Sequence, residues 1–172
     1  FFYAPLVITG LHHMFLAVDF QLMGSSLKGT YLWPIVAISN ICQGSAAFGA
    51  WLIYKRRKMA KEEGLALTSG VSAFLGVTEP AMFGVNLPLK VPFFAAICTS
   101  GILGAVIGAN RVLGNVGVGG VPAFISIQSK YWYIYIPVIL LAMILPAVLT
   151  VVFSKFTKVK AKEMIENPDD RK

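Results

Sequence analysis

The chain has 172 residues, of which 56% are hydrophobic and only 13% are charged. Soluble domains usually carry about 25% charged residues, because these residues cover a surface that faces water. The composition therefore excludes an ordinary soluble protein and predicts an all-α membrane protein, whose outer face is solvated by lipid. The net charge of +7 comes largely from bases that follow long apolar runs, which indicates membrane anchoring and argues against nucleic-acid binding.

The first apolar stretch extends to Met23 and contains His12, His13 and Asp19, so it should not face lipid on all sides. Neighbouring helical residues point about 100° apart, so only one histidine aims squarely into a pocket, and Asp19 shares nearly the same face as His12. The alternative is a packed histidine bonded to the backbone. Adjacent histidines rarely bind one ion, and no third ligand lies nearby, so we expect no metal site. Because the chain begins within this apolar stretch, we expect it to be a piece of a longer protein.

Three uncharged runs predict transmembrane helices at 31–54, 92–109 and 131–153. Polar residues form a stripe on the first run, and we expect them to make hydrogen bonds between helices, with the lining of a wet pathway as the alternative. The stripe consists of Asn40, Gln43, Gly44 and Ser45.

The apolar run from Leu65 to Leu89 is repeatedly interrupted by glycine and proline, which argues against one smooth helix. Basic clusters at 55–61 and 155–162 are both predicted to be cytoplasmic. Two complete spans between the clusters already return the chain to the same side, and this run is too short for two crossings of about 20 residues each. We therefore expect a re-entrant hairpin with its tip near 76–80.

Glu79 is the only acidic residue between Glu63 and Glu163, and it lies at the predicted hairpin tip. A carboxylate at membrane depth is costly, so an isolated one is a candidate functional residue. Its two oxygens accept hydrogen bonds from neighbouring sugar hydroxyls, whereas a proton-coupled transporter would use it to bind and release a proton. The alternative is a structural carboxylate that satisfies backbone N–H groups of the hairpin. The glycine-rich stretch 114–120 lacks a Gly-Lys-Ser/Thr ending, so we interpret it as a connecting loop and not as a nucleotide site.

Two motifs resemble those of a known family. Residues 76–86, GVTEPAMFGVN, resemble the signature of enzyme IIC (EIIC) domains of the phosphotransferase system (PTS), in the glucose/glucoside superfamily. Residues 10–13, GLHH, resemble a second motif of the same family. Residues 3–14, and the segments LWP, SNI and QGSA between 32 and 46, are most similar to trehalose-specific permeases, and sucrose and β-glucoside permeases share much of this pattern.

The resemblance implies that residues 1–162 are the C-terminal part of a ten-helix EIIC domain with re-entrant hairpins, followed by a soluble charged tail at 163–172. It implies a homodimer in the bacterial plasma membrane. It also implies a sugar site in which Glu79 and His12 contact hydroxyls. The further candidates for sugar contact are His13, Thr78 and Asn86.

The function implied by the resemblance is import of a disaccharide, with trehalose favoured over sucrose or a β-glucoside, and phosphorylation of its 6-hydroxyl. The phosphoryl group would come from a phosphocysteine of a IIB domain, supplied in turn by IIA and HPr, so no cofactor is expected. The IIB cysteine motif is absent here, so this segment alone should not phosphorylate sugar. Two other classes remain open: an ion-coupled secondary transporter, and a structural membrane subunit.

Overall fold

The computed structural model describes residues 2–24, 29–115, 117 and 119–156, and helices make up nearly all of its regular structure. In this part of the chain, three helical stretches are long and apolar enough to cross a membrane. They are α3 (Leu32–Arg56), α7 (Val91–Ala109) and Ser129–Lys155, which covers all but the last residue of α8 (Trp132–Phe156). Their bounds agree within a few residues with the predicted spans, so the expectation of an all-α membrane protein is confirmed.

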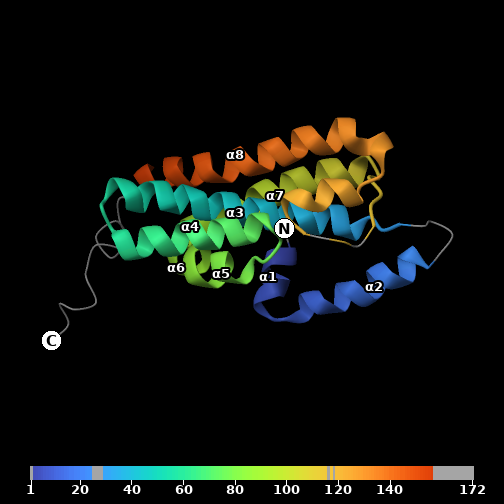
Figure 1. Cartoon of the computed structure of the whole chain (residues 1–172), viewed down its shortest axis with the longest axis horizontal. Coiled ribbons are helices and arrows are strands. Elements are labelled where there is room, and N and C mark those ends of the chain that lie inside the picture. The colour runs from blue at the N-terminus through green and yellow to red at the C-terminus, as the bar shows by residue number, and fades with distance from the viewer. Residues whose placement is uncertain (1, 25–28, 116, 118, 157–172) are drawn as a thin grey trace.

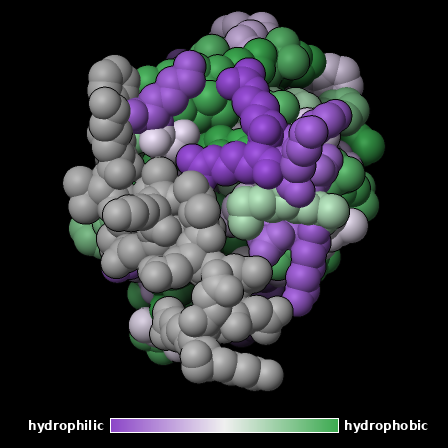
Figure 2. All heavy atoms as spheres, turned by 90° about the vertical axis from the view of Figure 1, so that its left-hand side faces the viewer, coloured by the Kyte–Doolittle hydropathy of each residue, from purple (hydrophilic) through white to green (hydrophobic). Residues whose placement is uncertain are grey.

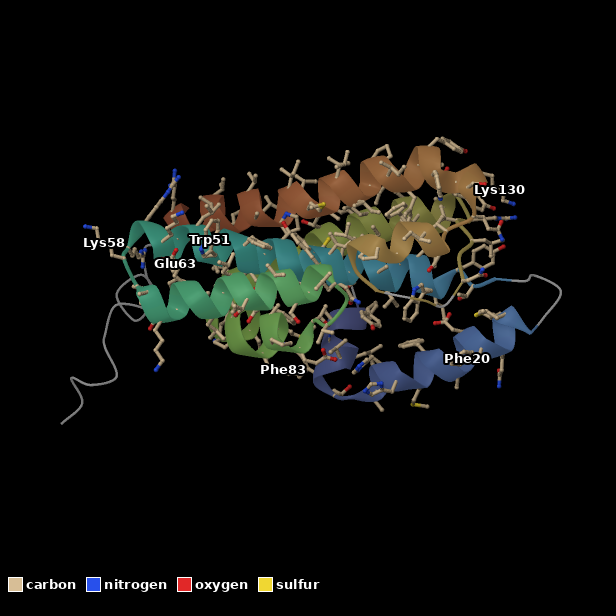
Figure 3. The ribbon with its side chains drawn as sticks, viewed as in Figure 1. Phe20, Trp51, Lys58, Glu63, Phe83 and Lys130 are labelled. Atoms are coloured by element: carbon tan, nitrogen blue, oxygen red, sulfur yellow. The ribbon has the colours of Figure 1, made fainter. Side chains whose placement is uncertain are left out.

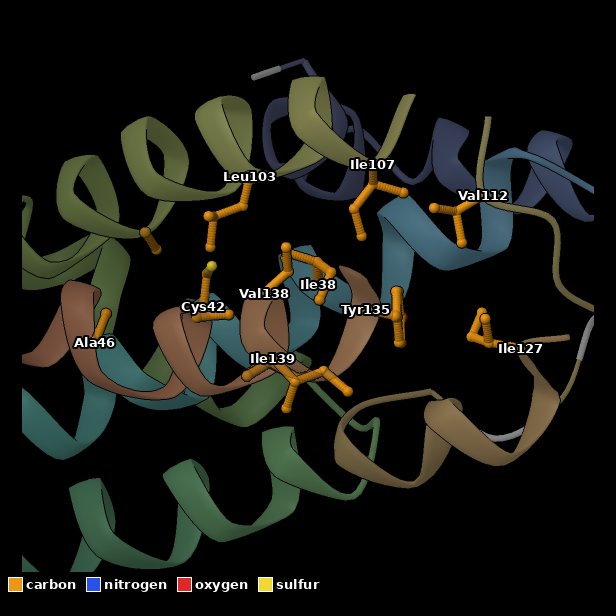
Figure 4. Close-up of a cluster of buried hydrophobic side chains, with 13 residues drawn as sticks. Ile38, Cys42, Ala46, Leu103, Ile107, Val112, Ile127, Tyr135, Val138 and Ile139 are labelled. Atoms are coloured by element: carbon orange, nitrogen blue, oxygen red, sulfur yellow. The ribbon is translucent and has the colours of Figure 1, made fainter. Parts of the chain in front are cut away.

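Helix α3 is the centre of the bundle and contacts α7, α8 and α4 (Ala60–Phe74) (Figure 1). The main core lies where α3, α7 and α8 meet (Figure 4). Small residues of α3 allow this close packing: a Cβ at Gly49 would lie 2.7 Å from Cβ of Thr150. The largest labelled side chains of the core are Ile38, Leu103, Ile107, Ile127, Tyr135 and Ile139.

Two members of the polar stripe on α3 make the expected bonds between elements. The Ser45 hydroxyl donates to the Met143 carbonyl at 2.6 Å and accepts from the Ala147 amide at 3.1 Å. It therefore bonds both the carbonyl and the amide of one turn of α8, next to Pro146. Gln43 accepts a hydrogen bond from Asn86. The prediction of interhelical bonding is therefore confirmed for Ser45 and Gln43.

The interrupted run forms a helical hairpin. Its first arm is α4, and its second arm is α5 (Glu79–Ala81), the π-helix η2 (Met82–Asn86) and α6 (Leu87–Leu89), which packs back against α4. The turn between the arms contains Gly76 at φ +106°, a conformation that only glycine adopts readily. The hairpin shape and the position of its tip agree with the sequence analysis. How deeply the hairpin enters a membrane stays a prediction.

The N-terminal segment is also broken. It consists of α1 (Tyr3–Ile8), a 3₁₀ turn η1 (Leu11–His13) and α2 (Met14–Met23), with Gly10 at φ +76° between the first two. Figure 1 shows α2 below the bundle, on the side of α5. Short connections thus bring two interrupted segments, far apart in the sequence, to the same side of α3.

Charged side chains gather at one end of the bundle, where α3 joins α4 and α8 ends (Figure 2). Lys58 and Glu63 lie at this end and Lys130 at the opposite one (Figure 3). The cluster at 55–61 therefore shares an end with Lys155, as two clusters on one side of a membrane would. The rest of the second cluster and the tail at 163–172 lie outside the described residues.

One connection completes the bundle. Residues 110–131 link α7 to α8 and include two 3₁₀ segments, η3 (Val121–Ser126) and η4 (Ser129–Tyr131). Gly114 pairs with Thr30 through two backbone hydrogen bonds of 2.8 and 3.1 Å. The connection is thereby tied to the residues that precede α3.

Candidate functional site

A pocket of about 170 Å³ lies where the N-terminal segment, α3 and the hairpin tip meet. The N-terminal segment and α3 contribute Tyr3, Val7, His12, His13, Phe15, Asp19, Trp33, Val36 and Asn40. The hairpin tip and the connection contribute Gly76, Thr78, Glu79 and Gly119. The pocket thus combines carboxylate, imidazole, amide and hydroxyl groups with aromatic rings.

Four of the five predicted sugar-contact residues line this pocket: His12, His13, Thr78 and Glu79. Asn86 lies outside it. Its side chain is fully buried, and Nδ2 donates to the Gln43 backbone carbonyl at 2.9 Å and to Gln43 Oε1 at 2.7 Å. These contacts hold the second arm of the hairpin against α3, so Asn86 packs between elements, and its contact with sugar stays a prediction.

Glu79 begins α5, directly after the turn at the hairpin tip. Its neighbour Thr78 is buried, whereas the Glu79 side chain is exposed in this chain although it lines the pocket. The sequence analysis placed Glu79 at membrane depth, and the described residues alone do not enclose its side chain. Glu79 nevertheless lines the same pocket as the two histidines.

The rings of His12 and His13 lie 4.0 Å apart, centroid to centroid, and Tyr3 meets His12 edge-on at 6.3 Å. Nδ1 of His12 is buried without a hydrogen-bond partner among the described residues. Burial and the neighbouring His13 lower the pKa of His12, which lies outside the three spans, and the Glu79 carboxylate opposes this shift. His12 is therefore a neutral imidazole near pH 7, able both to donate and to accept hydrogen bonds.

The aromatic wall of the pocket was missed in the sequence. Tyr3, Phe15 and Trp33 come from three different helices, and no spacing in the sequence links them. Burial, and then the charges of Glu79 and Asp19, raise the pKa of Tyr3 to about 12, so its hydroxyl stays protonated and can donate. For the N-terminal part of the pocket, the motif GLHH was the only local signal in the sequence. Asp19 was the only further lining residue that the sequence analysis placed on the same helical face as His12.

Backbone contacts position the hairpin tip. Gly76 packs on Gly119, where an added Cβ would lie 2.9 Å from backbone atoms, and a Cβ on Gly120 would lie 2.2 Å from the Phe74 carbonyl oxygen. Gly120 also has φ +68°. The glycine-rich stretch, interpreted above only as a connecting loop, is therefore the surface against which the tip of the hairpin rests.

The charges of the lining residues restrict the ligand. Two carboxylates, Asp19 and Glu79, line the pocket, and neither lysine nor arginine is among its described lining residues. Within the described part of the chain, no group of three or more histidine, cysteine, aspartate or glutamate residues is placed to hold a metal ion. Such a pocket favours a neutral ligand that is rich in hydrogen-bond donors over an anion.

Apolar spans around a broken hairpin, with a polar pocket at its tip, define an integral membrane domain with a candidate site for a polar ligand. The sequence matches the family described as Phosphotransferase system, EIIC over residues 1–101, and the chain belongs to this family.

Named relatives agree with this assignment. The chain is 51% identical over 156 residues, 90% of its length, to a PTS system trehalose-specific EIIBC component of Bacillus subtilis, and 46% identical over 87% of its length to that of Escherichia coli. It is 50% identical over 77% of its length to a sucrose-specific EIIBC component of Staphylococcus xylosus. These alignments cover 33%, 31% and 28% of the respective relatives, so the chain spans about a third of their length. No solved structure matches the chain.

Proposed function

We propose that this chain is the sugar-binding part of a PTS permease that imports a disaccharide, with trehalose as the favoured sugar. The observation that carries the proposal is the convergence of Glu79, Thr78 and His12 on one pocket that has neither lysine nor arginine among its described lining residues. Carboxylate oxygens accept from pairs of sugar hydroxyls, and such charge-assisted hydrogen bonds are stronger than neutral ones.

The aromatic wall supports a sugar ligand. A sugar ring has polar edges and an apolar face of C–H groups, and aromatic side chains combine an apolar body with, in tyrosine and tryptophan, a polar tip. Tyr3, Phe15 and Trp33 supply such surfaces in the pocket that the polar groups of the hairpin tip also line. An ion site would need no such surface.

The choice of trehalose rests on relatives. The two trehalose-specific relatives are 51% and 46% identical to this chain, and the sucrose-specific relative from S. xylosus is 50% identical. Sucrose is therefore the alternative sugar. Because the relatives are EIIBC components, we expect a IIB domain to supply the phosphoryl group, and this segment to position the sugar 6-hydroxyl.

The test uses a full-length permease that contains this sequence, in membrane vesicles supplied with the phosphoryl donors of the system. Labelled trehalose, sucrose and maltose are compared. The proposal predicts that trehalose enters best and appears inside only as its phosphate. Accumulation of free sugar that collapses with the proton gradient would instead establish an ion-coupled secondary transporter, and no uptake of any disaccharide would refute a sugar permease.

A further inference from the structure

We propose that Asp19 is a second sugar-binding carboxylate, which holds the ring of the disaccharide that lies farther from Glu79. The inference rests on the proposed function, because it concerns the same pocket. It adds the residue that lets this pocket distinguish two linked sugar rings from one.

The first argument is the distance between polar groups along one wall. Asp19 and His12 both line the pocket, and seven residues separate them along η1 and α2. They therefore lie on nearly the same face, about 10 Å apart along the helix axis. Polar groups two helical turns apart suit a ligand of two linked pyranose rings better than a single ring.

The second argument is the state of the carboxylate. The Asp19 side chain is 1% exposed, and one oxygen, Oδ1, accepts a hydrogen bond from the Thr30 hydroxyl. Among the described residues, no other hydrogen bond to this carboxylate is found, and no lysine or arginine lines the pocket. An ionised carboxylate has about four acceptor positions, so one donor leaves further positions of Asp19 for the hydroxyl groups of a sugar.

The third argument is that Asp19 is held in place. The Thr30 hydroxyl that donates to Asp19 also accepts from the Leu32 amide at 3.0 Å, and the Thr30 backbone pairs with Gly114. These contacts fix Asp19 relative to the start of α3. A carboxylate held in this way loses little freedom when a ligand binds, which favours affinity.

The two carboxylates share one neighbour. Both Glu79 and Asp19 lie close enough to Tyr3 to raise the pKa of its hydroxyl, so Tyr3 is within electrostatic reach of both carboxylates.

A purely structural role for Asp19 makes a different prediction. If Asp19 serves only to anchor Thr30 and the start of α3, then Asp19→Asn and Thr30→Val should have the same consequences. Thr30 does not line the pocket, so Thr30→Val removes the anchor and leaves the carboxylate.

The experiment measures equilibrium binding of labelled trehalose, and of methyl α-glucoside as a single-ring probe, to the full-length permease in detergent. Wild type, Asp19→Asn, Thr30→Val and Glu79→Gln are compared, and the unfolding temperature is recorded without sugar. We expect Asp19→Asn to weaken trehalose binding at least tenfold, with glucoside binding and unfolding temperature unchanged. Glu79→Gln should weaken both ligands.

The outcomes separate the inference from the proposed function. Equal losses for trehalose and glucoside in Asp19→Asn, no loss at all, or losses matched by Thr30→Val would overturn the role of Asp19. If the glucoside binds too weakly to measure, a trehalose affinity lower in Asp19→Asn than in Thr30→Val at equal unfolding temperature supports the role. Wild-type binding by Glu79→Gln would instead refute the proposed function.

Discussion

The long helices and the broken hairpin place backbone polar groups in an apolar setting in two different ways. In α3 and α7 the backbone groups are satisfied within the helix, and side chains are free to pack. In the hairpin, the helix is interrupted at Gly76, which packs against Gly119 of the glycine-rich connection, and the following residues Thr78 and Glu79 line the pocket. The comparison teaches that the continuous helices hold the domain together, whereas the interrupted segments supply most of the lining of the candidate site.

The largest effect on sugar binding is expected from the acid at the hairpin tip. Glu79→Ala removes both acceptor oxygens, so binding of labelled trehalose should fall more than about 100-fold, the loss of about two charge-assisted hydrogen bonds. Membrane insertion and the elution profile in detergent should not change. Glu63→Gln is the matched control, because Glu63 lies at the charged end of the bundle. Undiminished binding of trehalose by Glu79→Ala would contradict the location of the sugar site at the hairpin tip.

The contact between hairpin and connection should be nearly as sensitive. Gly120→Ala places a methyl group 2.2 Å from the Phe74 carbonyl oxygen and puts a side chain at φ +68°. We expect it to cost about 2–4 kcal/mol and to weaken trehalose binding by displacing the tip. A Cβ on Gly64, within α4, meets no atom within 4 Å, so Gly64→Ala should leave binding unchanged. Thermal unfolding and sugar binding, measured on both variants, check this.

A smaller difference should separate the two histidines. His12 is half-buried against the Tyr3 ring, whereas His13 is exposed. We expect His12→Ala to weaken trehalose binding about tenfold and His13→Ala by less, because one lost hydrogen bond near a charged group corresponds to about that factor. Titration calorimetry on the two variants gives the comparison. A larger loss for His13→Ala would show that the exposed ring faces the sugar.

The smallest effect on binding is expected within the bundle. Ser45→Ala leaves the Met143 carbonyl and the Ala147 amide without their partner, so it should destabilise the α3–α8 contact by about 1–2 kcal/mol and leave sugar affinity within twofold. Ser154→Ala, which removes a bond only to Val151 of the same helix, should change neither quantity. A strong loss of sugar binding in Ser45→Ala would contradict the separate roles of the helical bundle in stability and of the pocket in binding.

The sequence was sufficient to predict the spans and the hairpin because both follow from local properties. Uncharged length predicts a span, and glycine or proline interrupts one. Glu79 and His12 could be selected because charge and imidazole are conspicuous in apolar runs. Tyr3 and Trp33 could not, since aromatic side chains are ordinary in such runs and only the fold brings these two to the same pocket.

Asn86 shows the opposite limit. Its position on the hairpin, seven residues after Glu79, made it a reasonable sugar contact, but the π-helical arm turns it toward α3, where Gln43 is its partner. A polar residue in an apolar segment signals a polar partner, and the sequence does not say whether that partner is a ligand or another side chain. The sequence analysis likewise interpreted Gly119 and Gly120 only as part of a connecting loop, because a contact with a turn that is distant in the sequence leaves no local pattern.

The most direct test of the central claim is a structure of the full-length permease with trehalose bound. This account predicts that the sugar lies against the hairpin tip, with hydroxyl groups within hydrogen-bond distance of the Glu79 carboxylate and the His12 ring. A sugar bound away from the turn at Gly76, or a Glu79 side chain directed into lipid, would contradict it.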